Sequence, residues 1–111
     1  MDSSDITLKN LMDTLKCYPR DMAAFKGLEE QYFLSHNWKQ LSELYQLRAD
    51  TIKKENPNES AHLYFKSGDI HEKRLGNKEE ALLAYQQAFA IHPQKKEYGD
   101  ILANFYTGQE N

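Results

Sequence analysis

Apolar residues recur every three to four positions along most of this chain, the spacing that places one stripe on the face of an α-helix. The first stripe consists of Leu8, Leu11, Met12 and Leu15. No segment alternates apolar and polar residues with the period of two that is typical of a half-buried strand, and the tight-hairpin pairs Asn-Gly and Asp-Gly are missing. The pattern therefore predicts an all-helical protein.

Capping residues and prolines divide the pattern into six helices. Asn37 and Asn77 each have a glutamine or glutamate three positions later, which is the form of a capping box. Pro57 suits the first position of a helix, and Gly76 can take the positive φ that ends one. The predicted helices span residues 4–17, 22–35, 38–55, 57–75, 78–91 and 94–107.

Potential helix caps also recur at a nearly regular interval, at Ser3, Asn37, Asn77 and Asn111. The first and last intervals are equal, and the middle one is longer. Pro19 stands at the same offset from Ser3 as Pro93 does from Asn77. A period of about 34 residues is typical of stacked helix hairpins, because a single hairpin cannot bury both of its faces and neighbouring hairpins supply the core.

The residue types within each unit resemble the tetratricopeptide repeat, with large aromatic, Leu-Gly and Tyr positions on a first helix and small, aromatic, small and proline positions on a second. The resemblance is clearest from residue 60 to residue 93. It implies an antiparallel helix-hairpin solenoid, a tetratricopeptide-like superhelix in which residues 1–111 form one domain. The residues that it assigns to packing between repeats are Phe25, Leu28, Tyr32, Tyr64, Gly68, His71, Gly76, Ala81, Tyr85, Ala88, Pro93, Leu102 and Tyr106.

The chain departs from the family pattern at several positions. Glu29 replaces the glycine, Gly99 replaces the large aromatic, and Thr7 and Leu41 replace the small alanine. In this register the chain begins with the second helix of a repeat and ends where the second helix of another repeat would be capped. We therefore expect either a segment of a longer array or a terminal surface that docks a partner.

The resemblance also implies a ligand groove that is lined by the first helix of each repeat. Its expected residues are Lys26, Glu30, Phe33, Phe65, Asp69, Glu72, Lys73, Asp100 and Asn104. The acidic members favour a partner with some basic character. A clamp for a peptide's terminal carboxylate, known in one subclass of the family, is not formed, because Glu30 and Lys66 stand where that subclass has asparagine.

Composition narrows the class of partner and the compartment. The 111 residues are 40% hydrophobic, and 14 basic and 17 acidic residues give a formal net charge of -3. This balance provides no general attraction to nucleic acid or to an anionic membrane. Cys17 is the one cysteine, so no intrachain disulfide can form, and no apolar stretch approaches the length of a membrane span. We expect a soluble, cytoplasmic protein.

Candidate chemistry is sparse. The four histidines have no HExxH or comparable ligand spacing, and no spacing pairs Cys17 with a catalytic base. Glycine-rich phosphate loops and nucleophile elbows do not occur. We therefore predict no catalytic residues, no metal and no cofactor. Trp38 is expected to wedge its helix against the preceding one, with a binding hot spot as the alternative.

These observations predict a protein-binding scaffold of unidentified partner rather than an enzyme. Two alternatives stay open. The chain could be an assembly element that forms homo-oligomers or docks through its terminal helices, or it could be a regulatory fragment of a larger multi-repeat protein.

Overall fold

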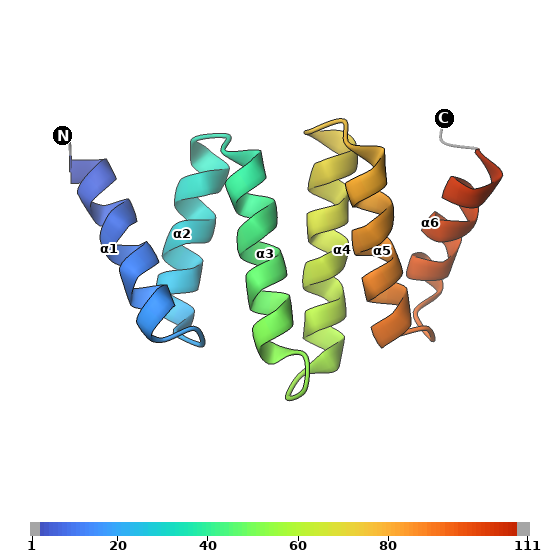
Figure 1. The fold of residues 1–111 in the computed structure, drawn as a ribbon, viewed down its shortest axis with the longest axis horizontal. Coiled ribbons are helices and arrows are strands. Elements are labelled where there is room, and N and C mark those ends of the chain that lie inside the picture. Colours follow the sequence, from blue (N-terminus) through green and yellow to red (C-terminus); the bar gives the residue numbers. More distant parts are fainter. Residues whose placement is uncertain (1–2, 109–111) are drawn as a thin grey trace.

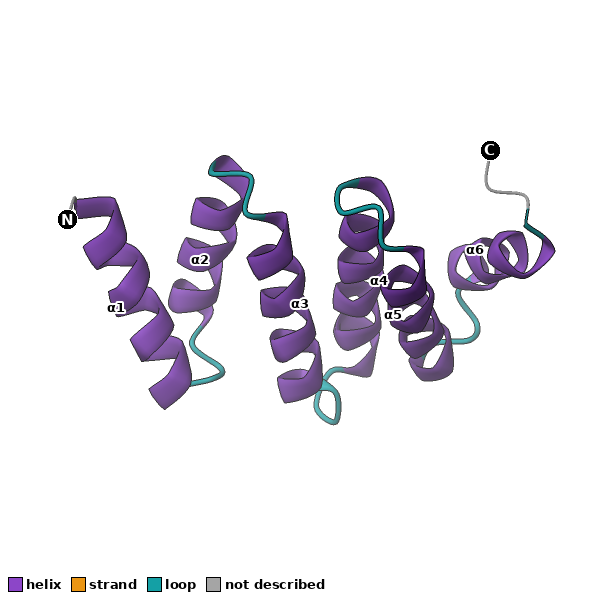
Figure 2. Cartoon of the chain, turned by 45° about the horizontal axis from the view of Figure 1, so that its top comes forward, coloured by secondary structure: helices purple, strands orange, loops and turns teal. Residues whose placement is uncertain are grey.

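The computed structural model describes residues 3–108, with side chains from Thr7 onward, as six α-helices joined by short turns (Figures 1 and 2). The helices are α1 (Ser3–Cys17), α2 (Met22–Leu34), α3 (Trp38–Ile52), α4 (Pro57–Lys73), α5 (Lys78–Ile91) and α6 (Lys96–Thr107). Residues 3–108 contain no strand, which confirms the predicted all-helical class and the number of helices. The predicted cap Asn111 lies outside the described residues, as does the side chain of Ser3.

The helices stand side by side in chain order, with the N-terminus and the C-terminus at opposite ends of the row (Figure 1). Among the described residues, all extensive contacts join helices that follow one another in the chain. The molecule measures 48 × 31 × 16 Å along its principal axes. One core cluster therefore runs through the row, from Leu15 in α1 to Tyr98 in α6, and a smaller cluster of Ala81, Tyr85 and Leu102 joins α5 to α6.

Three predicted helix boundaries were wrong by two or three residues, each because a short turn was counted as helix, and two more, the start of α1 and the end of α2, were wrong by one residue. Residues 53–55 form a turn that closes with a 2.8 Å bond from the Asn56 N–H to the Ile52 carbonyl. Asn56, with φ of -142° and ψ of 74°, has left the helical region, which is disfavoured for the residue before a proline. Residues 74–75 lie beyond α4, and residues 94–95 form a turn before α6.

The side chains of the cap residues behave unequally. Asn77 accepts a hydrogen bond from the Glu80 N–H at 3.2 Å, and Asn56 accepts one from the Glu59 N–H at 3.3 Å. Asn37 makes no side-chain cap bond, so the capping box predicted there is wrong. The reciprocal half of a capping box needs the N–H of the cap itself, but the Asn37 N–H donates to the Tyr32 carbonyl at 2.9 Å and the Asn77 N–H donates to the His71 carbonyl at 2.8 Å. At Asn77 only the side-chain half of the predicted box is therefore formed.

The two turns that precede α3 and α5 share a backbone conformation. Gly76 has a φ of 66°, and His36, at the equivalent place before Asn37, has a φ of 60°. Glycine adopts this left-handed region without cost, whereas a residue with a Cβ is disfavoured there by about 1–2 kcal/mol. A left-handed residue directly before the cap therefore occurs twice, at the spacing that separates Asn37 from Asn77.

Most residues assigned to packing between repeats are buried. They are Phe25, Leu28, Tyr32, Tyr64, Gly68, Ala81, Tyr85, Ala88 and Leu102. His71 is partly buried, and Gly76 and Pro93 lie exposed in turns. Tyr106 is 66% exposed, because no described helix packs on the outer face of α6.

Two helices approach each other closely where Gly68 of α4 faces Tyr85 of α5. A Cβ added at Gly68 would lie 2.7 Å from Cε1 and 2.8 Å from Cδ1 of the Tyr85 ring, well inside van der Waals contact. The ring is fully buried and cannot move aside without disturbing its neighbours. Glycine is therefore required at this position for steric reasons.

No helix among the described residues is long and apolar enough to cross a membrane.

Two helical glycines provide a matched stability test. Gly68→Ala should lower the free energy of unfolding by about 1–3 kcal/mol, because the new methyl group overpacks the contact with Tyr85. Gly99→Ala should be neutral or stabilising by about 0.4–1 kcal/mol, because its Cβ would meet Phe89 at an ordinary 3.5 Å. Urea unfolding of both variants measures the difference, and equal stabilities would contradict the packing described here.

Candidate functional site

Two adjoining depressions lie along α4. The first, which we call the aromatic depression, has a volume of about 260 Å³ and lies between α2, α3 and α4. It is lined by Phe33, Trp38, Leu41, Tyr45, Lys66, Asp69, Ile70, Lys73 and Arg74. The second, the polar depression, has a volume of about 570 Å³, lies between α4 and α6, and is lined by Phe65, Asp69, Lys73, Lys96, Glu97, Asp100, Ile101 and Asn104.

The structure brings six of the nine expected groove residues together in these depressions. They are Phe33, Phe65, Asp69, Lys73, Asp100 and Asn104. Asp69 and Lys73 line both depressions and form their common border.

Three expected groove residues lie elsewhere. Lys26 and Glu30 are exposed on α2 but line neither depression. Glu29, one position away from Glu30, takes the place that faces α4, since its Oε2 lies 3.6 Å from Nζ of Lys66. Glu72 faces α5 instead, where its Oε1 lies 2.9 Å from the Tyr85 hydroxyl.

Tyrosine–carboxylate hydrogen bonds join successive helices, and two of them share one sequence separation; a further one joins Tyr64 to Asp50. The Tyr45 hydroxyl donates to Oε2 of Glu29, and the Tyr85 hydroxyl donates to Oδ1 of Asp69, both at 2.7 Å. The two pairs have the same sequence separation, and the second follows the first at the interval between Asn37 and Asn77. The motif was not predicted, because Glu29 was considered only as a departure from glycine; the equal separation of the two pairs in the sequence is the signal that could have revealed it.

Asp69 is held from two sides at the border of the depressions. Below it is the buried Tyr85 hydroxyl, and Nζ of Lys73 lies 3.6 Å from its Oδ1. Burial, and then the hydrogen bonds and charges of Asp69 and Glu72, raise the pKa of Tyr85 above its ordinary value. The hydroxyl therefore stays protonated and keeps the Asp69 carboxylate in a fixed position.

The aromatic depression is built around Trp38, at the start of α3. The ring of Phe33 meets it edge to face at 5.6 Å, and the ring of His36 stacks on it at 5.5 Å. The guanidinium carbon of Arg74 lies 4.7 Å from the Trp38 ring centroid, within the range of a cation–π contact. Trp38 thus joins the α2–α3 turn to the end of α4, as a wedging residue would, and it also lines an open surface.

The polar depression has an aromatic floor and charged walls. The Phe65 ring lies 5.3 Å from Tyr85 and 5.1 Å from Tyr98, which fixes it between α4, α5 and α6. On the α6 wall, Nζ of Lys96 lies 3.6 Å from Oδ2 of Asp100, and both side chains are largely exposed. Phe65 is therefore mainly structural, whereas the α6 residues are available to a ligand.

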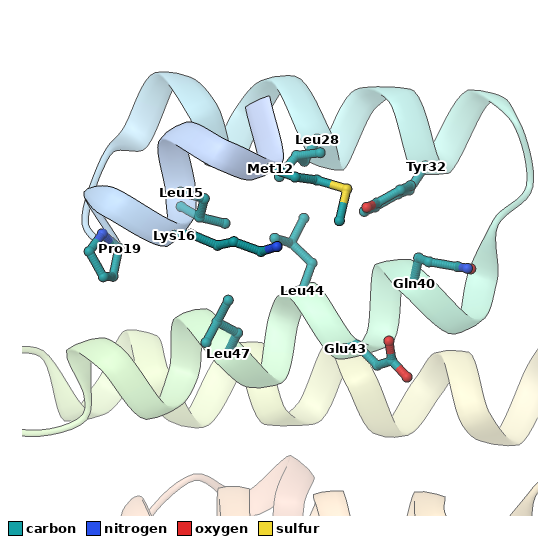
Figure 3. A pocket seen from close by; sticks show the side chains of 10 residues that line it. All are labelled: Met12, Leu15, Lys16, Pro19, Leu28, Tyr32, Gln40, Glu43, Leu44 and Leu47. Atoms are coloured by element: carbon teal, nitrogen blue, oxygen red, sulfur yellow. The ribbon is translucent and has the colours of Figure 1, made fainter. Parts of the chain in front are cut away.

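A further groove lies between α1 and α3, over α2, with a volume of about 340 Å³ (Figure 3). Figure 3 shows mainly apolar side chains, with Lys16 extending among them and with Gln40 and Glu43 toward one side; the lining residues are Met12, Leu15, Lys16, Pro19, Leu28, Tyr32, Gln40, Glu43, Leu44 and Leu47. It exists because α1 and α3 both pack on α2 without an extensive contact between them. This groove was not predicted, because apolar stripes do not give the distance between two helices that are not neighbours in the chain.

Within residues 3–108, no three or more histidine, cysteine, aspartate or glutamate side chains are grouped so as to hold a metal ion. Cys17 is exposed.

Comparison with models of known protein families gives no match, and no curated protein matches this sequence.

The buried tyrosine hydroxyl predicts a pH-dependent effect of Tyr85→Phe. Near pH 8 the free energy of unfolding of the variant should be about 1–2 kcal/mol lower than that of the parent, because Asp69 and Glu72 lose their hydrogen-bond donor. Above about pH 10 the Tyr85 hydroxyl of the unfolded parent ionises while the folded one keeps its proton, so this part of the parent's stability falls by about 1.4 kcal/mol per pH unit until the raised folded pKa is reached. The difference in the free energy of unfolding between parent and variant should therefore become smaller as the pH rises above about 10.

Urea unfolding at pH 8 and pH 11 measures this difference, with Tyr18→Phe, which removes an exposed hydroxyl, as the control. If the free energies of unfolding of the parent and of Tyr85→Phe differ by the same amount at both pH values, a protonated, carboxylate-bound hydroxyl is excluded.

Proposed function

We propose that this chain is a non-catalytic binding module, a tetratricopeptide-like helical solenoid that holds a peptide or protein segment in a groove over α2, α4 and α6. The observation that carries the proposal is the convergence of Phe33, Asp69 and Asn104, from three alternate helices, on two depressions that share a border. Residues spaced along one extended surface suit an extended ligand rather than a compact metabolite.

The repeat character of the scaffold is supported by features that recur at the interval between Asn37 and Asn77. These are the left-handed turn residues His36 and Gly76 and the hydrogen-bonded tyrosines Tyr45 and Tyr85. Contacts between successive helices only, in a single row, also suit a solenoid.

A rigid groove favours binding because the receptor loses little conformational freedom. Asp69 is fixed by the Tyr85 hydroxyl, and Phe65 is fixed by two aromatic neighbours, so both are ordered before a ligand arrives. The module needs no cofactor and performs no reaction. We place it in the cytoplasm, in keeping with its single cysteine.

A matched pair of triple variants tests the groove. The groove variant combines Phe33→Ala, Asp100→Ala and Asn104→Ala, and the control combines Leu83→Ala, Glu79→Ala and Gln87→Ala on the exposed stripe of α5. Phe33 and Leu83 are both 55% exposed, so each variant removes one half-exposed apolar, one acidic and one amide side chain.

Affinity capture from native lysate, followed by titration of the purified partner, should show binding weakened about tenfold or more by the groove variant and unchanged by the control, because few residues dominate such interfaces. Equal capture by all three proteins would exclude the groove.

The second candidate function is assembly through the ends of the row. Tyr106 and Phe89 are exposed and line a depression of about 280 Å³ between α5 and α6, and the apolar groove of Figure 3 lies toward the opposite end. Each of these surfaces resembles a place where a further helix would pack.

Under this alternative, sedimentation velocity should show a mass that rises with concentration for the parent. Tyr106→Ser should abolish the rise, because it removes the largest exposed apolar group of α6, whereas Leu83→Ser should not. A mass that stays monomeric over the whole concentration range would remove assembly from consideration.

A further inference from the structure

The two depressions of the groove differ in charge. The aromatic depression has three basic side chains in its lining, Lys66, Lys73 and Arg74, and one acidic side chain, Asp69. This excess is local, because the chain as a whole has a formal net charge of -3. The polar depression does not share it, since its acidic residues outnumber its basic ones.

Arg74 is the basic group most available to a ligand. Lys66 and Lys73 each have a carboxylate oxygen at 3.6 Å, from Glu29 and Asp69 respectively. Among the described residues no carboxylate pairs with Arg74, whose guanidinium is positioned by its contact with Trp38. A guanidinium offers several donors in a fixed plane, which matches the geometry of a carboxylate.

Apolar surface lies directly beside these charges. Phe33 is 55% exposed although its ring packs against Trp38, and both line the same depression as Arg74. An aromatic side chain of a ligand can pack on this pair while a neighbouring carboxylate reaches the guanidinium.

We propose that the aromatic depression binds a peptide segment in which an acidic residue lies next to an aromatic or large aliphatic one. The inference rests on the proposed groove and names the ligand class for one end of it. The basic partner character expected from sequence then applies to the polar depression, which contains Asp100 and Glu97. Because the two ends prefer opposite charges, a bound peptide has one preferred direction along the groove.

Trp38 is the only tryptophan of the chain, so its emission reports directly on this depression. The probes are peptides selected from a displayed random-sequence library on the immobilised full chain, then synthesised with capped ends. The selected peptides should be enriched in aspartate or glutamate beside an aromatic residue and should produce a saturable change in Trp38 emission.

The test variant combines Lys73→Gln with Arg74→Gln, and the matched control combines Lys53→Gln with Lys54→Gln in the exposed turn after α3. The test variant should bind the selected peptides about tenfold more weakly, and the control within about twofold of the parent. Replacing the peptide's acidic residues by their amides should weaken binding to the parent but not to the test variant, since a coupled pair loses its interaction only once. Thermal unfolding of each variant verifies that it is folded.

Two results would overturn the inference in distinguishable ways. Selected peptides without acidic enrichment, or peptides that bind the Lys73 and Arg74 variant as tightly as the parent, refute the charge assignment while the groove itself stands. If no peptide from the library binds, or if binding survives Phe33→Ala, Asp100→Ala and Asn104→Ala together, the proposed groove fails as well.

Discussion

The contact between Gly68 and Tyr85 is the constraint on which the C-terminal half of the row depends. The missing side chain at Gly68 lets α4 and α5 approach, and the Tyr85 ring fills the space between them. Burying its hydroxyl without a partner would cost several kcal/mol, and Asp69 and Glu72 remove that cost. The same ring lies 5.6 Å from Phe105, so one side chain links three successive helices.

This contact also connects packing to the proposed function. The carboxylate that accepts the hydrogen bond from the Tyr85 hydroxyl is that of Asp69, the residue at the border of the two depressions. A group needed for the stability of the interior thereby fixes a group at the surface. The position of Asp69 is then set by the core and not by the ligand, which is the physical basis of a preformed site.

The N-terminal half uses the same motif with looser packing. Tyr45 donates to Glu29 as Tyr85 does to Asp69. In this alignment Leu28 corresponds to Gly68, so the predicted register, which placed Glu29 at the glycine position, is off by one residue here. The Leu28 side chain occupies space, and the rings of Phe25 and Tyr45 lie 6.2 Å apart, against 5.3 Å for Phe65 and Tyr85. Because each helix contacts mainly its chain neighbours, a difference at one junction stays local. The apolar groove between α1 and α3 lies in this half.

Local sequence signals were sufficient for the helices of this protein. The stripes, Pro57 and Gly76 predicted all six helices and most of their ends, because amphipathic spacing and backbone restrictions act within a few residues. They failed at Asn37, whose side chain makes no cap bond. Six of the nine residues that the repeat register assigned to a groove line the two depressions, since a helix position specifies a face.

Distances between helices were decided only by tertiary structure. Helix separations and rotations decide whether Glu29 or Glu30 faces α4 and how closely Arg74 approaches Trp38. They also decide that α1 and α3 leave an apolar groove between them. These quantities result from the packing of many side chains at once, and no short stretch of sequence contains them. The sequence by itself determined which face of each helix is apolar. The charge pattern of the two depressions, one with more basic and the other with more acidic side chains, arose only when residues from α2, α3, α4 and α6 came together in space.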